Sequence, residues 1–300
     1  MRFEAADGVE LGGFLWRRAG PDADRPIVVV SAATSVRCRY YARFAAHLHH
    51  HGFDVLTFDY RGVGQSRPAR LRGFRAGWRE WGELDLDAAL GHAMALGPGR
   101  PVHVVGHSFG GVAIGLAPRA RAVRRIVTVG AQYAYWRDYA AGERAAMVRR
   151  WHAAMPALAL ALGYVPARRL GWMEDTPRGV ALDWARMGPR IERRLDPAGA
   201  SDLPGRFAEV TAPILAISLT DDPFGTPAAI ERALGYFSRS PRAHLRVAPE
   251  DAGAAAIGHF AFFHDRFRDR LWPLALGFLQ DGRLPDGHPG AVAARFAPSA

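Results

Sequence analysis

A serine stands in a pattern that is typical of nucleophilic catalysis. Residues 106–110 read Gly-His-Ser-Phe-Gly and match G-x-S-x-G, with Ser108 at the centre. Residues 102–105 before them are β-branched and mostly apolar, like a buried strand, and a short helical pattern begins at Gly110. Such a tight turn from strand to helix requires glycine on both sides, and it exposes the serine hydroxyl at the helix N-terminus, where backbone N–H groups favour negative charge. A chance match in a glycine-rich chain is the alternative, but these flanking patterns favour Ser108 as a nucleophile.

A serine hydroxyl is a weak nucleophile, so it needs a general base, and the base needs a carboxylate that orients it. After a turn of this kind, the acid and then the histidine follow the serine along the chain, on loops after later strands. The strand-like residues 213–219 end in the acidic pair Asp221-Asp222, followed by Pro223. We expect Asp222 to be the acid, because it directly precedes the proline. Asp221 is the alternative, and Asp-Pro is also ordinary turn chemistry.

Twelve histidines compete for the role of the base. We expect His259, because it follows the strand-like residues 242–247 and a loop of small residues, and it opens a helical pattern over residues 260–279. His264 lies one turn further along and is expected to pack or to face solvent. His107 lies beside the nucleophile and cannot also be the distant third member.

Acyl transfer also requires donors for an oxyanion. The first expected donor is the backbone N–H that follows the nucleophile, which belongs to Phe109. The second should come from the loop after the strand-like residues 26–31, where small residues allow a close backbone approach. Thr34 is the favoured donor in this loop, and Ala33 is the alternative.

These residues require a scaffold of alternating strands and helices. Residues 2–16 read as a hairpin around Asp7-Gly8, and buried strands are predicted at residues 26–31, 53–58, 101–106, 124–130, 213–219 and 242–247. Helices are predicted at residues 39–50, 83–96, 109–118, 226–237 and 260–279. Alternation of this kind predicts an α/β fold with a mostly parallel central sheet and helices on both faces.

One segment interrupts the alternation. Residues 131–208 are rich in helix formers and contain no clear strand, so we expect an inserted helical cap between a main domain of residues 1–130 and 209–280. The Pro/Gly-rich residues 281–300 are expected to form a loose tail. The cap segment carries the aromatic residues Tyr133, Tyr135, Trp136, Tyr139, Trp151, Tyr164, Trp172 and Trp184.

Such side chains suit the wall of a pocket for an apolar acyl group, although packing of the cap on the main domain would require them equally. Residues 155–165 are apolar on every side, unlike a surface helix with one polar face, so weak contact with a membrane surface through the cap is a minor possibility.

Composition excludes several classes of protein. Cys38 is the only cysteine, so no disulfide can form within the chain, and 49% hydrophobic residues exclude a disordered chain. The net charge of +10 comes from arginines scattered in ones and twos, in a chain without lysine or asparagine, so we expect no nucleic-acid partner. No targeting signal is recognised, and the apolar runs are too short to span a membrane. We therefore expect a cytoplasmic protein.

Four motifs resemble one known family. The chain is similar to α/β-hydrolases of the monoacylglycerol-lipase and serine-aminopeptidase branch. The resemblance covers residues 3–279 and rests on Asp59-Tyr-Arg-Gly-Val-Gly-Gln-Ser66, Gly-His-Ser-Phe-Gly-Gly, Asp-Asp-Pro-Phe-Gly-Thr-Pro and Ile-Gly-His-Phe. A bacterial subgroup of predicted hydrolases is more similar still, because it carries motifs like Asp175-Thr-Pro-Arg-Gly-Val-Ala-Leu-Asp-Trp184 and Ile257-Gly-His-Phe260. Ala32-Ala33 replaces the family's usual His-Gly before the oxyanion loop, so the second donor is the position that the resemblance does not identify.

The resemblance implies a serine hydrolase that cleaves a small-molecule carboxyl ester through an acyl-enzyme, without metal or organic cofactor. No H-E-x-x-H, paired cysteines or dinucleotide-binding glycine motif is present in the sequence. An acyltransferase, a thioester or amide hydrolase and a non-catalytic binding protein that retains the fold are the alternatives.

Overall fold

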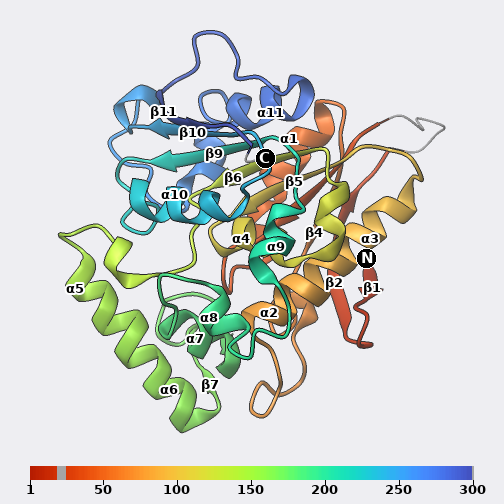
Figure 1. Ribbon diagram of the computed structural model, residues 1–300. Coiled ribbons are helices and arrows are strands. Elements are labelled where there is room, and N and C mark those ends of the chain that lie inside the picture. The colour runs from red at the N-terminus through yellow and green to blue at the C-terminus, as the bar shows by residue number, and fades with distance from the viewer. Residues whose placement is uncertain (19–24, 299–300) are drawn as a thin grey trace.

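A nine-stranded β-sheet runs through the molecule (Figure 1). The computed structural model describes residues 1–18 and 25–298. The strand order is β1-β2-β4-β3-β5-β6-β9-β10-β11, and the run from β4 to β10 is parallel, with antiparallel partners at both ends. The strands of this sheet are β1 (Arg2–Glu4), β2 (Glu10–Trp16), β3 (Ile27–Ser31), β4 (Asp54–Phe58), β5 (Val102–His107), β6 (Arg125–Val129), β9 (Ile214–Leu219), β10 (Arg242–Val247) and β11 (Ala291–Phe296).

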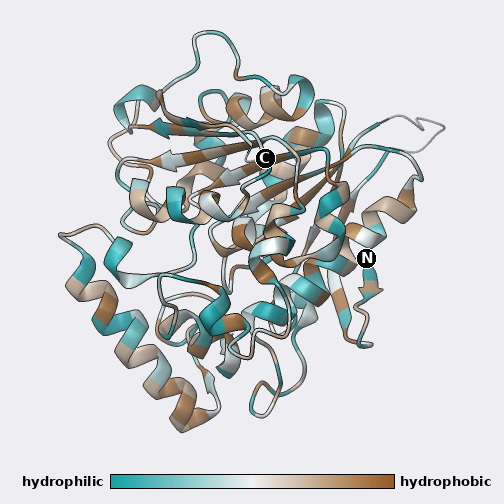
Figure 2. Ribbon diagram, viewed as in Figure 1, coloured by the Kyte–Doolittle hydropathy of each residue, from teal (hydrophilic) through white to brown (hydrophobic). Residues whose placement is uncertain are grey.

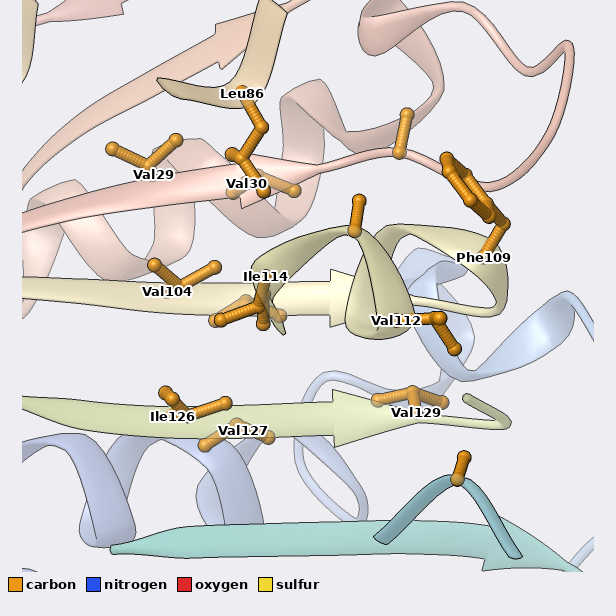
Figure 3. Packing of buried hydrophobic residues seen from close by; sticks show 14 of the residues in the cluster. Val29, Val30, Leu86, Val104, Phe109, Val112, Ile114, Ile126, Val127 and Val129 are labelled. Atoms are coloured by element: carbon orange, nitrogen blue, oxygen red, sulfur yellow. The ribbon is translucent and has the colours of Figure 1, made fainter. Parts of the chain in front are cut away.

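The core lies around the central parallel strands. Every residue of β3, β4, β5 and β9 is buried, because helices cover both faces of these strands and β-branched residues can fill both sides. Figure 3 shows Val29, Val104 and Ile126 on neighbouring strands, with Leu86 and Ile114 packed over them. The carboxyl ends of these strands lie at one edge of the sheet, next to Phe109.

Two groups of helices cover the sheet. On one face α1 packs beside α11, where the rings of Phe44 and Trp272 are 5.4 Å apart. On the other face lies a continuous helical segment of α2, a π-helical stretch (Trp81–Leu86) and α3, with α4 and α10 beside it (Figure 1). The bounds of these helices are α1 (Ala42–His50), α2 (Trp78–Glu80), α3 (Asp87–Leu96), α4 (Phe109–Leu116), α10 (Pro227–Tyr236) and α11 (Trp272–Asp281).

The predicted fold class is confirmed: the sheet is mostly parallel, and helices lie on both of its faces. Between β6 and β9 the chain leaves the sheet and forms mostly helices at its carboxyl edge (Figure 1). The first of these helices are continuous with a π-helical stretch and project from the body as one long segment of residues 144–162. The elements of the insertion are α5 (Arg144–Met147), α6 (Met155–Leu162), β7 (Tyr164–Val165), β8 (Thr176–Pro177), α7 (Arg178–Ala185), α8 (Glu192–Leu195) and α9 (Leu203–Ala208).

The sequence led us to expect a loose tail over residues 281–300, but part of this tail is ordered. Within residues 281–300, β11 adds an antiparallel strand to β10, whose outer edge offers backbone N–H and C=O groups to a partner. Arg242 strengthens this pairing, because its guanidinium donates to the Ala297 carbonyl and lies over the ring of Phe296. Residues 299 and 300 of the tail lie outside the described residues.

The prediction of a helix over residues 260–279 is also wrong for the first half of this range. Short 3-10 turns occupy this part, and His264 between them has extended backbone angles. The α-helix begins only at Trp272, where Pro273 occupies a position in the first turn that lacks an intrahelical N–H bond in any case. The indole N–H of Trp272 donates to the Phe262 carbonyl and ties the irregular segment to the helix.

Among the residues described, we find no helix whose length and apolar character would allow it to cross a membrane.

Candidate active site

The turn at Ser108 has the strained geometry that its glycine-flanked pattern indicates. Ser108 has a φ of 53°, which is unfavourable for a residue with a side chain, and α4 begins directly after it. A Cβ on Gly106 would lie 2.5 Å from the Gly111 Cα, and one on Gly110 would lie 2.2 Å from the Ser31 carbonyl oxygen. Both positions therefore require glycine. The Ser108 N–H donates to the Val129 carbonyl at 2.9 Å, which fixes the turn against the end of β6.

The structure brings two of the candidate residues into direct contact. Asp222 follows β9 and His259 follows β10, and the Asp222 Oδ2 lies 2.6 Å from the His259 Nδ1. The other carboxylate oxygen of Asp222 accepts the Phe224 N–H at 2.8 Å. Burial alone would raise the pKa of Asp222, but the attraction of His259 and the hydrogen bonds from His259, Gly225 and Phe224 leave this pKa below its ordinary value. Asp222 is therefore an ionised, buried partner that can orient the imidazole.

Asp221, the alternative acid, has different partners. Its Oδ2 accepts the backbone N–H groups of Ile257 and Gly258 at 2.8 and 2.9 Å. These two residues directly precede His259. Asp221 therefore holds the loop that carries the histidine, whereas Asp222 contacts the ring itself.

The two candidate oxyanion donors lie on the loop after β3 and at the start of α4. Phe109 is the first residue of α4, so its N–H has no partner within the helix. On the loop, the Ala33 N–H already donates to the Tyr41 hydroxyl at 2.9 Å. For the Thr34 N–H we find no hydrogen-bond partner among the described residues. This difference favours Thr34 over Ala33 as the second donor.

The loop at residues 59–66, which carries the D-x-R-G-x-G-x-S motif, supports this region. Both oxygens of the Asp59 carboxylate are used, since one accepts the Cys38 N–H at 2.6 Å and the other the Gln65 N–H at 2.8 Å. Gly64 has a φ of 48°, and a Cβ there would lie 2.2 Å from the carboxylate. The motif therefore has a structural role: it fixes the chain just after the loop with Thr34.

A buried network joins the loop with Ala33 and Thr34 to the segment that carries His259. The His107 Nε2 must donate to the His259 carbonyl, 2.9 Å away, because a carbonyl oxygen only accepts. Burial, together with the charge of His259, lowers the pKa of His107 to about 3, so its Nδ1 can accept a hydrogen bond from the Tyr41 hydroxyl, 2.8 Å away. Tyr41 in turn accepts the Ala33 N–H. The sequence contains no pattern that singles out Tyr41.

Gln132 is a second neighbour of the site that we did not select from the sequence. It lies on the loop after β6, and its Nε2 is 3.4 Å from the Ser108 Oγ. A lone glutamine after a strand carries no sequence signal of such a role. Among the described residues, the hydrogen bonds of the Ser108 Oγ include this one and none to His259. Contacts of a nucleophile with its base are often long before substrate binds.

The motif at residues 175–184 connects the insertion to the main domain. The Thr176 hydroxyl lies 2.8 Å from the Ser35 hydroxyl, directly after the candidate oxyanion residue. The Asp183 carboxylate accepts the Trp78 N–H at 2.9 Å, at the start of α2. A Cβ on Gly62 would lie 2.5 Å from Pro177, so the insertion also contacts the 59–66 loop closely.

Aromatic rings extend from the insertion to the candidate histidine. Phe224 lies 4.8 Å from the His259 ring, and both Trp151 and Trp184 lie 6.3 Å from Phe224. On the other side, Trp78 stacks on Phe109 at 4.6 Å and lies 6.3 Å from Trp184. Two of the aromatic residues expected at the pocket are not part of this group of rings. Tyr133 donates instead to the Pro189 carbonyl, and Trp136 is exposed.

The candidate residues are enclosed. The exposed fractions are 6% for Ser108, 3% for Asp222 and 7% for His259. A cleft of about 800 Å³ opens nearby between residues 72–80 and helices α6 and α7, but none of these three residues lines it. Within the part of the chain that is described, no group of three or more His, Cys, Asp or Glu side chains is arranged to hold a metal ion.

Comparison with known proteins bears on the family and the fold of the chain. The monoglyceride lipase of Saccharomyces cerevisiae is 26% identical over 112 residues, a match that spans 37% of this chain and only 36% of that relative. Among solved structures, a soluble variant of the same yeast lipase in complex with a substrate analogue superposes with a TM-score of 0.65 at 16% identity, over 95% of each chain. A carboxyl esterase from Bacillus coagulans gives a TM-score of 0.62 at 13% identity, over 93% of this chain and 97% of that one.

These two structures share the α/β-hydrolase fold with this chain. A family model described as "Serine aminopeptidase, S33" matches residues 22–249, which is most of the chain. The chain therefore belongs to the serine aminopeptidase S33 family of α/β-hydrolases.

Proposed function

We propose that the protein is a serine hydrolase that cleaves a carboxyl ester through an acyl-enzyme. The observation that carries the proposal is the 2.6 Å contact between Asp222 and His259, on loops next to the strained turn at Ser108. The yeast relative is a lipase and one structural neighbour is a carboxyl esterase, which supports the same class of reaction.

The mechanism has two steps. The Ser108 Oγ attacks the ester carbonyl while its proton moves to the His259 Nε2, and the alcohol leaves with that proton. Water then attacks the acyl-enzyme in the same manner and releases the acid. Asp222 orients the imidazole and stabilises its charged form. The N–H groups of Phe109 and Thr34 hold the oxyanion, where the loss of one donor costs about 3 kcal/mol of transition-state stabilisation.

We further propose that residues 131–208 act as a cap and that the acyl group is apolar and of small to medium size. The rings of Trp151, Trp184 and Phe224 next to His259 support an apolar site, because aromatic side chains offer large apolar areas with few rotamers to immobilise. The low exposure of Ser108 implies that side chains around it move when the substrate binds.

A membrane surface is proposed as a weak second partner. Leu160 and Leu162 at the end of α6, with Leu170 after it, are 41–50% exposed, and Figure 2 shows that this end of α6 is hydrophobic. Arg168 and Arg169 are exposed nearby and could contact anionic headgroups. Co-sedimentation with anionic vesicles tests the contact, which Leu160→Gln with Leu162→Gln should weaken.

The decisive experiment is labelling with a fluorophosphonate, followed by a panel of p-nitrophenyl esters of increasing chain length. We expect stoichiometric labelling of Ser108 and ester turnover. Ser108→Ala should abolish both and leave the melting temperature nearly unchanged, because the turn accommodates a small residue. Undiminished turnover by a pure Ser108→Ala preparation would contradict the whole mechanism. If the acyl group goes to a dilute added alcohol in preference to water, the enzyme is an acyltransferase on the same residues.

A further inference from the structure

Gln132 lies beside the nucleophile, and the mechanism above gives it no role. Its side chain is buried, with 4% exposed, and its Nε2 is 3.4 Å from the Ser108 Oγ. The orientation of the carboxamide is determined by its other end, because Oε1 accepts the N–H of Ala134. An amide that accepts through its oxygen on one side must present its NH₂ group on the other. The group that faces Ser108 is therefore a donor.

The backbone around Gln132 is built to hold this orientation. Gly130 has a φ of 57°, and Ala134 has a φ of 61°, which is unfavourable for a residue with a Cβ. Strained residues of this kind persist where the surroundings determine the conformation, and they are often found at functional sites. Gly130 and Ala134, the residues with positive φ, flank Gln132 on the loop after β6. Val129, the last residue of β6, accepts the N–H of Ser108, so this loop begins beside the nucleophile.

We propose that Gln132 is a further catalytic residue, which donates a side-chain N–H to the Ser108 Oγ and favours breakdown of the acyl-enzyme. The inference deepens the proposed function and rests on it. In deacylation, water bonds to the acyl carbon and gives a proton to His259. The bond from this carbon to the Ser108 Oγ then breaks, its electron pair goes to the Oγ, and the Oγ takes the proton back from His259.

An N–H aimed at the Oγ has unequal effects on the two half-reactions. In deacylation it stabilises the negative charge that develops on the departing oxygen. In acylation the N–H already donates to the resting hydroxyl and occupies a lone pair of the attacking oxygen, so it gives little net help to the attack. The expected signature of Gln132 is therefore a selective effect on deacylation, which a residue that merely supports the loop would not have.

The test measures the two half-reactions separately in Gln132→Met, which keeps the length of the side chain and removes the donor. Acylation is followed as p-nitrophenolate release from p-nitrophenyl butyrate in a single turnover, and deacylation as the loss of the butyryl mass from Ser108. We expect deacylation to slow about tenfold, the effect of one neutral hydrogen bond, with acylation unchanged or faster. Gln280→Met, the same substitution on the exposed end of α11, is the matched control and should change neither rate.

Gln132→Glu is the second variant, and it carries the test if the methionine variant does not fold. It keeps an oxygen for the Ala134 N–H but offers no N–H to Ser108, so deacylation should again slow more than acylation. Equal slowing of both steps, or unchanged rates, in a folded variant overturns the inference. The proposed function fails separately, if the unmodified protein is not labelled at Ser108 or if Ser108→Ala still turns over ester.

Discussion

At the scale of residues, the two neighbouring aspartates after β9 differ in what their carboxylates hold. Asp222 contacts the His259 Nδ1, whereas Asp221 accepts two backbone N–H groups of the loop before the histidine. Asp222→Asn should therefore lower kcat by about three to four orders of magnitude, because an amide that donates to Nδ1 favours the wrong tautomer. Steady-state kinetics with p-nitrophenyl esters measures this effect.

Asp221→Asn is the control for this prediction. It retains one oxygen for the Ile257 and Gly258 N–H groups, so the loss of kcat should stay below about tenfold. If Asp221→Asn were the more damaging change, the assignment within the pair would be wrong, although a serine mechanism would remain.

Residue types and their order along the chain were enough to select Ser108, Asp222 and His259 as candidates. Each carries a local signal: the two glycines around Ser108, the proline after Asp222, and the small-residue loop before His259. Tyr41 and Gln132 carry no such signal. Their neighbours in the site are distant in sequence or reached through a strained loop, so only the folded structure reveals them.

At the scale of elements, the strong periodic patterns predicted the strands and helices of the sheet to within a few residues, whereas the edge strand β11 was missed. Its sequence alternates weakly, and its side chains are largely exposed, so most of its pairing energy comes from backbone groups that any residue offers. The first half of the helix predicted over residues 260–279 was wrong because aromatic packing and Pro273 override helical spacing there.

Removal of β11 tests its contribution. Truncation after residue 285 should leave labelling of Ser108 intact, because β11 is an edge strand that β6, β9 and β10 separate from β5. It should lower the melting temperature and promote aggregation, because the edge of β10 becomes unpaired. Light scattering and thermal unfolding measure these effects. Val292→Pro, which removes one backbone N–H from the strand, should reproduce part of the loss, and a truncated protein as stable as the full chain would contradict this role.

At the scale of the whole molecule, buried histidines should make stability depend on pH. Burial lowers the pKa of His103 to about 4 and that of His107 to about 3, against about 6.5 in an unfolded chain. Between pH 6.5 and these values the unfolded chain binds more protons than the folded one. The free energy of unfolding should therefore fall as the pH drops below 6.5, by up to about 1.4 kcal/mol per pH unit for each histidine.

Urea unfolding at pH 5.0 and 7.5 measures this dependence. His103→Met removes one of the two groups, and since His103 is buried beside Phe53 an apolar side chain suits its surroundings. The difference in unfolding free energy between the two pH values should shrink in this variant. An unchanged difference would show that His103 is not among the groups responsible.

The insertion is the other feature that acts at this scale. It lies at the carboxyl edge of the sheet (Figure 1) and contributes Trp151 and Trp184 to the rings near His259. Ser108, Asp222 and His259 instead follow strands of the sheet, outside the insertion. The chemistry and the selection of the acyl chain should therefore be separable. Replacing residues 140–200 by a short Gly/Ser linker should change the chain-length preference among p-nitrophenyl esters more than it changes fluorophosphonate labelling of Ser108.

Loss of the insertion also removes the Ser35–Thr176 contact and exposes apolar surface, so the deletion needs a milder companion. Trp184→Ala in the complete chain enlarges the space beside Phe224 and leaves the cap in place. It should shift the preference toward longer acyl chains, because the removed ring leaves an apolar volume that extra methylene groups can fill, at about 0.8 kcal/mol for each one buried. If the preference is the same in the unmodified protein, the deletion and Trp184→Ala, the acyl site lies wholly within the main domain and the assignment of the cap to substrate selection is wrong.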